Sequence, residues 1–310
     1  MVDSINKKYI KKMAAEHFSA AVFSIDKLGK GGAATAYKVV LENGKIVVFK
    51  NYHIEGMYQK EASALRLLRR HSPICVPEVY FVYGKTDDIL CECICMEYIK
   101  GVNSLIFKHL LKSKSKKKNL VQTVVEATIK IHNHTSEKFG CVCNPIFDTW
   151  QDYYKPFCKS VLTAAQTANA SGKLKKFILD LLEKSYSHFD FIFSDKIEKA
   201  SLLHGDLNVM NIMVDKKTLE PVAFIDPLNS VYGDPEYDIF QFKNLWGDCW
   251  GFYDYYKDIA VASEKCDLKT AFYAFFNEVN WVANGGKLLG IIMNPIVKNI
   301  KRQFEIWGLM

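Results

Sequence analysis

The chain has 310 residues, of which 49% are hydrophobic and 24% charged. This length and composition indicate a globular protein with one large core or two lobes around a cleft, and they exclude a short peptide, a coiled-coil rod and a disulfide-stapled scaffold. The net charge of +7 is uneven, because residues 101–144 carry eight basic and two acidic side chains, whereas residues 145–310 carry 18 and 21. No run approaches the roughly 18 apolar residues of a membrane span, and four lysines among residues 1–16 precede no apolar core. We therefore expect a protein that is neither embedded in a membrane nor exported.

The nine cysteines are an odd number in hydrophobic contexts, which indicates a reducing compartment and a cytoplasmic protein rather than a disulfide framework. Cys91, Cys93 and Cys95 alternate along one segment, and this spacing predicts the buried face of a strand rather than a zinc site. The basic run at 112–118 contains no aromatic residue or glycine. We therefore interpret it as a solvated loop and expect no nucleic-acid partner.

The first hundred residues have the pattern of strands separated by turns. Asn43-Gly44 lies between two β-branched runs and is a strong hairpin signal. A helical pattern at 58–70 follows the hairpin. Strands are predicted at 23–26, 36–41, 46–50, 78–83 and 89–96. The sequence thus predicts an N-terminal lobe at 1–97 that binds the nucleotide. This lobe consists of a small antiparallel sheet and one helix.

After Gly101 the pattern becomes mainly helical. Helices are predicted at 120–132, 173–193, 268–283 and 295–307. One hairpin interrupts them, in which 211–215 pairs with 222–226. We assign 98–310 to a helical C-terminal lobe, so the predicted fold class is α+β with two lobes, and an active site is expected in the cleft between them.

The segment His204-Gly-Asp-Leu-Asn-Val-Met-Asn211 is the most informative part of the chain. It places one carboxylate, Asp206, five residues before an amide, and Asp226 follows at the far end of the predicted hairpin. The two strands of a hairpin are antiparallel, so its first and last residues lie close together. Asn211 and Asp226 should therefore be neighbours in the folded protein. Two oxygen ligands at one point suit Mg²⁺, which takes protein oxygens together with phosphate and water. Asp206 is then the group expected to orient an attacking hydroxyl and accept its proton.

This pattern, His-Gly-Asp followed by an asparagine, a hairpin and an aspartate, resembles the catalytic and metal motifs of the aminoglycoside phosphotransferase and choline kinase group. That group shares the two-lobe, protein-kinase-like fold. Ile225-Asp226-Pro227 and Val231-Tyr-Gly-Asp-Pro-Glu-Tyr-Asp238 are especially similar to streptomycin-kinase-like and fructosamine-kinase-like members. The resemblance implies that His204 braces the catalytic loop and that Asp238 anchors the backbone of that loop.

Residues upstream fit the nucleotide side of such an enzyme. The glycine-rich turn with Gly29, Gly31 and Gly32 lies between two predicted strands, where main-chain amides can approach phosphates closely. The full G-x-G-x-x-G pattern is absent, so an ordinary hairpin turn is the alternative. Lys50 ends the third strand, where its ammonium could reach phosphates, and Glu61 on the following helix could form an ion pair with it.

The segment Met96-Glu-Tyr-Ile-Lys-Gly101 resembles the hinge of that group. Main-chain groups around Glu97 and Ile99 would hydrogen-bond a purine there. Because this role belongs to the backbone, the side chains do not choose between ATP and GTP as the co-substrate.

The acceptor is expected in the C-terminal lobe, whose slight acidic excess favours a cationic, hydroxylated molecule. The aromatic runs at 246–256 and 272–281 could hold an amine or a sugar ring, or they could be helix-packing core. Three side chains are candidates for the acceptor site, Asp248, Trp250 and Glu278. The segment 150–154 resembles one that some antibiotic kinases keep near the acceptor.

We therefore predict a Mg²⁺-dependent small-molecule kinase that transfers the γ-phosphoryl group of ATP or GTP to a hydroxyl of an amine-bearing or sugar-like acceptor, as in aminoglycoside phosphotransferases. A choline-, ethanolamine- or fructosamine-type metabolic kinase is the alternative. A protein kinase is disfavoured by His-Gly-Asp in place of His-Arg-Asp and by the lack of an Ala-Pro-Glu segment after Asp226. A nucleotide-binding scaffold without turnover is a further alternative, although every catalytic residue type is present.

Overall fold

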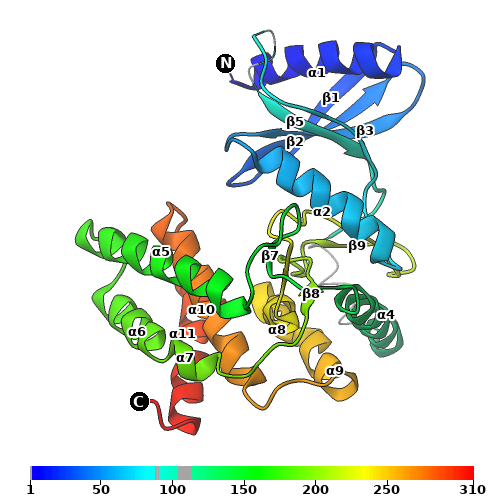
Figure 1. The fold of residues 1–310 in the computed structure, drawn as a ribbon. Coiled ribbons are helices and arrows are strands. Elements are labelled where there is room, and N and C mark those ends of the chain that lie inside the picture. The colour runs from blue at the N-terminus through cyan, green and yellow to red at the C-terminus, as the bar shows by residue number, and fades with distance from the viewer. Residues whose placement is uncertain (1, 88, 90, 104–112) are drawn as a thin grey trace.

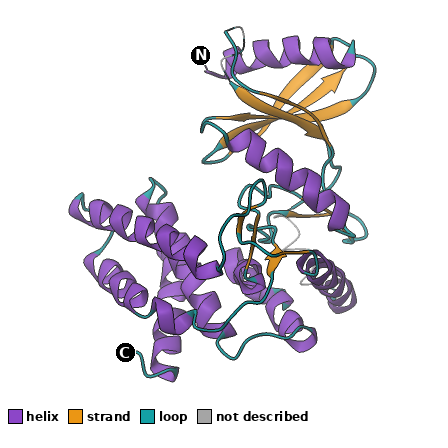
Figure 2. Cartoon of the chain, viewed as in Figure 1, coloured by secondary structure: helices purple, strands orange, loops and turns teal. Residues whose placement is uncertain are grey.

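The computed structural model describes residues 2–87, 89, 91–103 and 113–310. A five-stranded antiparallel sheet with two helices forms the N-terminal part, and a mainly helical part follows it (Figure 1 and Figure 2). The strand order is β1-β2-β3-β5-β4. The strands are β1 (Val22–Lys30), β2 (Ala34–Leu41), β3 (Ile46–Tyr52), β4 (Val79–Tyr83) and β5 (Glu92–Glu97). This is the α+β architecture that the sequence predicts.

The turns of this sheet form where short-range signals place them. Gly44, between β2 and β3, has a φ of +83°, a left-handed conformation that a residue without a Cβ adopts at no steric cost. Asn43 Oδ1 accepts a hydrogen bond from Lys45 N at 3.0 Å. The turn between β1 and β2 is closed by a hydrogen bond of 2.9 Å from Gly31 N to Ala34 O.

Helices cover both faces of the sheet. α2 (Met57–His71) packs on the face that carries Lys50, and α1 (Val2–Phe18) packs on the opposite face (Figure 1). The sequence predicts a single helix in this lobe, and α1 corrects that prediction. The fully buried part of its contact with the sheet is formed by three apolar residues, Ile10, Met13 and Ala14. Such a short apolar stripe within a lysine-rich segment gives only a weak helical period.

Cysteines of β5 take part in the contact with α1. Cys93 and Cys95 are fully buried there, and Cys91, just before the strand, is buried as well. Burial raises the pKa of the Cys95 thiol well above its ordinary value, so it stays protonated. The prediction of a buried strand face is therefore confirmed.

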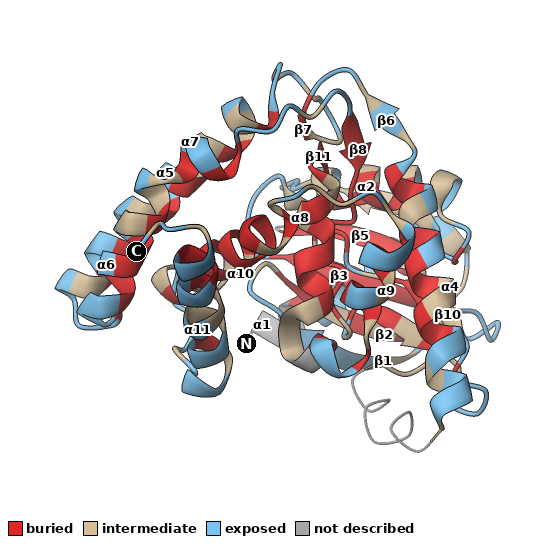
Figure 3. Ribbon diagram, turned by 90° about the horizontal axis from the view of Figure 1, so that it is seen from below, coloured by how far each residue is buried: buried red, intermediate tan, exposed pale blue. Residues whose placement is uncertain are grey.

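The C-terminal part is built from helices around one hydrophobic core (Figure 3). Its helices are α4 (Lys114–His132), α5 (Trp150–Ala170), α6 (Lys176–Ser187), α7 (Phe189–Ile192), α8 (Pro235–Ile239), α9 (Phe252–Ile259), α10 (Cys266–Ala283) and α11 (Gly290–Ile306), with a 3-10 helix η1 (Phe240–Cys249). The largely buried α10 packs against α5, α8 and α11. Among the described ranges, no helix is both long and apolar enough to cross a bilayer.

Two helix predictions need correction. α4 begins at Lys114, so the lysines at 114–118 are helical rather than in a loop, while Lys112 lies outside the described residues. The buried side chains of Leu120 and Val124 explain the helix, because packing of an apolar face outweighs repulsion between exposed lysines. The predicted helix at 173–193 is divided into α6 and α7, which meet at His188.

Short strands frame the loop at 203–211. β8 (Ala200–Leu202) and β11 (Val231–Gly233) belong to a four-stranded sheet of order β6-β8-β11-β7. The outer strands are β6 (Thr135–Ser136) and β7 (Gly140–Cys141). β9 (Ile212–Val214) and β10 (Pro221–Phe224) form the predicted antiparallel hairpin. As a result, the segments before β9 and after β10 lie side by side.

A buried ion cluster holds α8 on α10. Lys269 Nζ lies 2.5 Å from Asp234 Oδ2 and 2.7 Å from Glu236 Oε2, and all three side chains are buried. Asp234 also accepts a hydrogen bond from the Tyr273 hydroxyl at 2.8 Å. Because removing one partner would leave a buried charge unpaired, the cluster fixes α8 and with it Asp238.

Candidate active site

A tight turn sets the direction of the loop that carries Asp206. Gly205 has a φ of +80°, and a Cβ added there would lie 2.1 Å from the main-chain oxygen of Asn229. Only glycine therefore fits between the two segments. The Asp238 carboxylate accepts hydrogen bonds from the main-chain amides of His204 at 2.7 Å and Gly205 at 2.6 Å. Asp238 thus anchors the loop backbone, in the position that the resemblance implies.

Two histidines support this anchor. His132 Nε2 lies 3.2 Å from Asp238 Oδ2. Burial acts to raise the pKa of Asp238, but hydrogen bonds from His132 and the loop outweigh it and lower the pKa, so the carboxyl stays ionised. His204 is buried, and its Nδ1 accepts a hydrogen bond from Asp206 N at 3.3 Å. The His204 ring therefore holds the main chain of the loop at Asp206.

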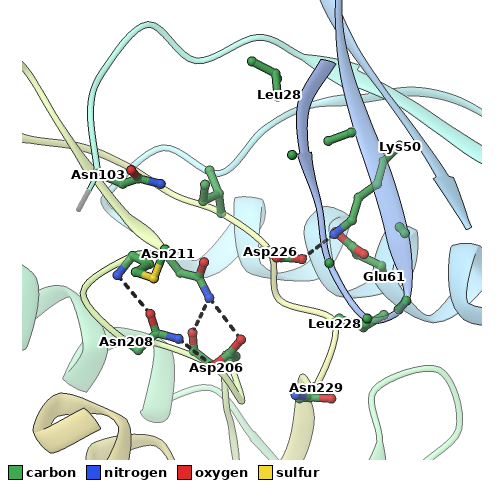
Figure 4. A pocket seen from close by; sticks show the side chains of 18 of the residues that line it. Leu28, Lys50, Glu61, Asn103, Asp206, Asn208, Asn211, Asp226, Leu228 and Asn229 are labelled. Atoms are coloured by element: carbon green, nitrogen blue, oxygen red, sulfur yellow. Dashed lines mark hydrogen bonds and ion pairs between the residues drawn. The ribbon is translucent and has the colours of Figure 1, made fainter. Parts of the chain in front are cut away.

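Two side-chain amides hold the Asp206 carboxylate (Figure 4). Asn208 Nδ2 donates to Oδ1 at 2.8 Å, and Asn211 Nδ2 donates to Oδ2 at 3.1 Å and to the main-chain oxygen of Asp206 at 2.7 Å. Asn208 was not among the residues predicted to belong to the site. Its place two residues after Asp206, inside the motif, was the available signal, because asparagine side chains often bond local groups at this spacing.

The hairpin of β9 and β10 brings Asp226 to the same place. Ile225 N donates to the main-chain oxygen of Asn211 at 3.0 Å, so Asn211 and Asp226 lie at adjoining ends of the two strands. Asp226 has a φ of +64°, a left-handed conformation that is unusual for a residue with a Cβ and is typical of functional sites. The Asn211 amide oxygen points away from Asp206 (Figure 4). An amide oxygen and a carboxylate are donors that fit Mg²⁺.

A lysine from the sheet reaches this site from the opposite lobe. Lys50 Nζ lies 2.7 Å from Glu61 Oε1 and also forms an ion pair with Asp226 (Figure 4). Glu61 is fully buried and its other oxygen accepts a hydrogen bond from the Tyr52 hydroxyl at 2.6 Å. Burial acts to lower the pKa of Lys50, but the two carboxylates outweigh it and raise the pKa. The ammonium is therefore charged at every physiological pH.

The pKa of the Asp206 carboxyl is raised to near neutrality. Burial raises its pKa from 3.8 to about 7, and the nearby charge of Asp226 adds to the rise, whereas hydrogen bonds from Asn208 and Asn211 lower it. A group with such a pKa can hold or release a proton at physiological pH, as a general base must.

A pocket of about 1100 Å³ joins these groups. Predicted residues that line it are Gly29, Gly31, Gly32, Lys50, Glu61, Glu97, Ile99, Asp206, Asn211 and Asp226. Apolar residues from both lobes line the pocket as well, including Ala36, Val48 and Ile225. At the hinge, Glu97 N already donates to Glu78 O at 2.8 Å. A purine there would therefore use the carbonyl of Glu97 and groups further along, around Ile99.

The acceptor candidates separate into two groups. Glu278 lines the pocket together with polar residues that the sequence analysis did not single out, Gln241, Asn244, Asn277 and Asn280. Asp248 is exposed and Trp250 is buried, and neither belongs to the pocket lining.

The segment 150–154 contributes to packing. Trp150 is buried, stacks on Tyr154 and donates a hydrogen bond to the Tyr273 hydroxyl at 2.8 Å. Trp150 and Tyr154 thus belong to the core, as do the buried phenylalanines of α10.

Known proteins resemble this chain over most of its length. A family model described as fructosamine kinase matches residues 5–303. The uncharacterized protein YcbJ of Escherichia coli K12 is 19% identical over 246 residues, which is 77% of this chain and 79% of YcbJ. A Thermobifida fusca protein assigned as a fructosamine-3-kinase has a TM-score of 0.66 at 19% identity, covering 94% of this chain and 98% of that one.

A second solved structure extends the likeness to enzymes that act on antibiotics. It is the complex of aminoglycoside phosphotransferase APH(2″)-IIIa with GDP and kanamycin, with a TM-score of 0.66 at 15% identity and 96% of each chain covered. At these identities the two solved structures establish the shared, protein-kinase-like fold. The family model spans nearly the whole sequence, and the chain therefore belongs to the fructosamine kinase family.

Proposed function

We propose that this small-molecule kinase transfers the γ-phosphoryl group of a nucleoside triphosphate to a hydroxyl group of a hydroxylated amine. The observation that carries the proposal is the convergence of Asp206, Asn211 and Asp226 beside Lys50 in one pocket between the lobes. The Lys50–Glu61 ion pair is formed in this structure. It supports the proposal that the site is catalytically active, because kinases of this fold need that pair in place for catalysis.

Asp206 acts as the general base. Its carboxylate accepts the proton of the acceptor hydroxyl while the bond from the hydroxyl oxygen to the γ-phosphorus forms. The bond from that phosphorus to the β–γ bridging oxygen breaks, and the nucleoside diphosphate leaves. The two asparagine amides that hold Asp206 fix the direction of its oxygens, so little reorganisation is needed when the proton moves.

Asn211 and Asp226 hold the metal, and Lys50 binds the phosphates. Mg²⁺, when bound, neutralises charge on the transferring phosphoryl group. Lys50 contacts Asp226 directly, so the residue that would bind the phosphates adjoins a residue that would hold the metal. The donors of this site, one amide oxygen and one carboxylate, match the few protein ligands that Mg²⁺ takes beside phosphate.

The nucleotide base lies at the hinge, against the apolar side chains near Glu97 and Ile99. The glycines of the β1–β2 turn lie over the phosphates. A Cβ on Gly29, at the end of β1 next to this turn, would meet nothing within 4 Å, so a phosphate can approach the main chain there without meeting a side chain. Main-chain recognition at the hinge permits ATP or GTP.

The acceptor lies on the other side of Asp206, against η1 and α10. Amides of Gln241, Asn244 and Asn277 line that region and can bond several hydroxyl groups. Glu278 supplies a negative charge there. Family membership makes a ketoamine sugar the first acceptor to test.

The test is transfer of labelled γ-phosphoryl from ATP and from GTP, with Mg²⁺, to three acceptors: an N-alkyl 1-amino-1-deoxyfructose, kanamycin and choline. We expect label in at least one acceptor, formed in proportion to the nucleotide consumed, and none with Asp206→Asn. A protein that binds nucleotide but transfers label to none of the three would contradict the proposal and favour a scaffold without turnover.

A further inference from the structure

Glu278 is a half-buried carboxylate that the pocket leaves without a partner. It lines the pocket on α10, and in the described part of the chain it forms neither an ion pair nor a side-chain hydrogen bond. Burial alone raises the pKa of Glu278 above its ordinary value. Partial burial of a carboxylate costs free energy unless a hydrogen-bond donor or a cation compensates. A ligand that carries such a group could therefore bind favourably at Glu278.

Trp281 lies one turn further along α10 and lines the same pocket. Residues three apart on a helix share a face, so Glu278 and Trp281 lie on the same side of α10. A Cβ on Gly286 would lie 2.2 Å from the Trp281 Nε1. The chain after α10 therefore rests directly on the indole and fixes it, although 53% of this residue is exposed.

The indole also reaches the nucleotide side of the pocket. A Cβ on Gly32 would lie 3.6 Å from Cζ3 of Trp281, so the glycine-rich turn of one lobe meets α10 of the other at this tryptophan. The neutral amides of Asn277 and Asn280 line the same pocket, as does the exposed Lys287, which forms no ion pair with Glu278 in the described part of the chain. Cation-binding sites for organic amines combine these same two elements, an aromatic face and a carboxylate.

We propose that Glu278 and Trp281 form the subsite that binds the ammonium group of the acceptor, and that this contact holds the acceptor hydroxyl at Asp206. The inference rests on the proposed function and names the residues that make the enzyme select a charged amine over a neutral sugar. Glu278 provides the charge and Trp281 the apolar face. The side-chain amides of Gln241 and Asn244 hydrogen-bond each other at 2.7 Å. They are among the groups that can hydrogen-bond the uncharged hydroxyl groups of the acceptor.

The experiment compares an N-alkyl 1-amino-1-deoxyfructose, whose nitrogen is charged, with its N-acetylated form, whose nitrogen is a neutral amide that carries an additional acetyl group. Glu278→Gln keeps the shape of the side chain and removes its charge. We expect kcat/KM for the amine to fall about tenfold or more, and kcat/KM for the acetylated sugar and KM for the nucleotide to stay within about twofold. Glu305→Gln, an exposed carboxylate on α11 outside the pocket lining, is the matched control and should change none of these values.

Trp281→Phe should retain most of the amine selectivity, and Trp281→Ala should lose it while folding normally, because the side chain is half exposed. Equal loss for both acceptors in Glu278→Gln, or no loss for either, would overturn the subsite.

Calorimetric measurement of amine binding in the presence of a non-hydrolysable nucleotide separates the two proposals. Binding that depends on Glu278 without any transfer contradicts the proposed function only, whereas transfer that is indifferent to Glu278 contradicts the subsite only. Absence of both binding and transfer contradicts both.

Discussion

The side-chain nitrogen of Asn211 lies 2.7 Å from the main-chain oxygen of Asp206 and 3.1 Å from its Oδ2. This double contact fixes which end of the amide faces Asp206, and it leaves the amide oxygen on the other side, toward the pocket (Figure 4). One residue thus connects the proposed base with the proposed metal site.

Replacing the two asparagines separates these roles. Asn211→Ala should lower turnover about 100-fold and raise the Mg²⁺ concentration needed for half-maximal rate, because both a bond to Asp206 and a metal ligand are lost. Asn208→Ala removes the amide that bonds the other oxygen of Asp206 at 2.8 Å and should lower turnover without changing the Mg²⁺ requirement. The measurement is initial rate against Mg²⁺ concentration. A shared Mg²⁺ dependence in the two variants would contradict the metal role of Asn211.

The raised pKa of Asp206 makes a prediction about stability. In the folded protein this pKa is about 7, above the ordinary value of 3.8, so between these values the folded state holds a proton that the unfolded state has released. The free energy of unfolding therefore falls as pH rises from about 4 to 7. Asp206→Asn lacks this titration and should gain about 2 kcal/mol relative to the natural protein between about pH 5 and pH 8. Urea unfolding of the nucleotide-free proteins at both pH values measures the difference, and a constant difference would show that the pKa is not raised.

The Lys50–Glu61 pair allows stability to be separated from nucleotide binding. Lys50→Met leaves the fully buried Glu61 carboxylate without its cation and should destabilise the fold by about 3 kcal/mol. The double variant Lys50→Met with Glu61→Gln removes that unpaired charge and should recover most of the stability. Both variants should bind nucleotide at least about tenfold more weakly, because the ammonium that meets the phosphates is absent. Recovery of nucleotide affinity in the double variant would show that Lys50 acts on the fold alone.

Gly205 should tolerate no side chain. Gly205→Ala places a methyl group 2.1 Å from Asn229 O at a φ of +80°, and it should lower the free energy of unfolding by about 2 kcal/mol or more. Gly29→Ala, with nothing within 4 Å of the added carbon, is the comparison and should melt at the temperature of the natural protein. Thermal unfolding followed by circular dichroism tests both, and equal melting temperatures would contradict the close approach of the two segments.

Local signals predicted the elements that carry the site. The Asn43-Gly44 turn and the hairpin between Asn211 and Asp226 are contiguous in sequence, so residue type and spacing specify them. The contact of Lys50 with Asp226 joins residues 176 positions apart. No local pattern contains it, and the sequence predicted only that Lys50 would pair with Glu61 and approach the phosphates.

The acceptor side was predicted least well, for a structural reason. Residues 240–249 form a 3-10 helix, whose period differs from that of an α-helix and changes which side chains face the pocket. Asp248 is therefore exposed outside the pocket lining, while Gln241 and Asn244 are part of it. Glu278, on the regular helix α10, lines the pocket, and its role in binding the acceptor stays a prediction.

Paired measurement of Mg²⁺-nucleotide affinity and turnover in Asp206→Asn and Asp226→Asn tests the central claim most directly. We predict that Asp206→Asn binds the nucleotide within about twofold of the natural protein and loses turnover by a factor of about 100 or more, and that Asp226→Asn loses both nucleotide affinity and turnover. Turnover at the natural rate in Asp206→Asn, or undiminished Mg²⁺-nucleotide affinity in Asp226→Asn, would contradict the account.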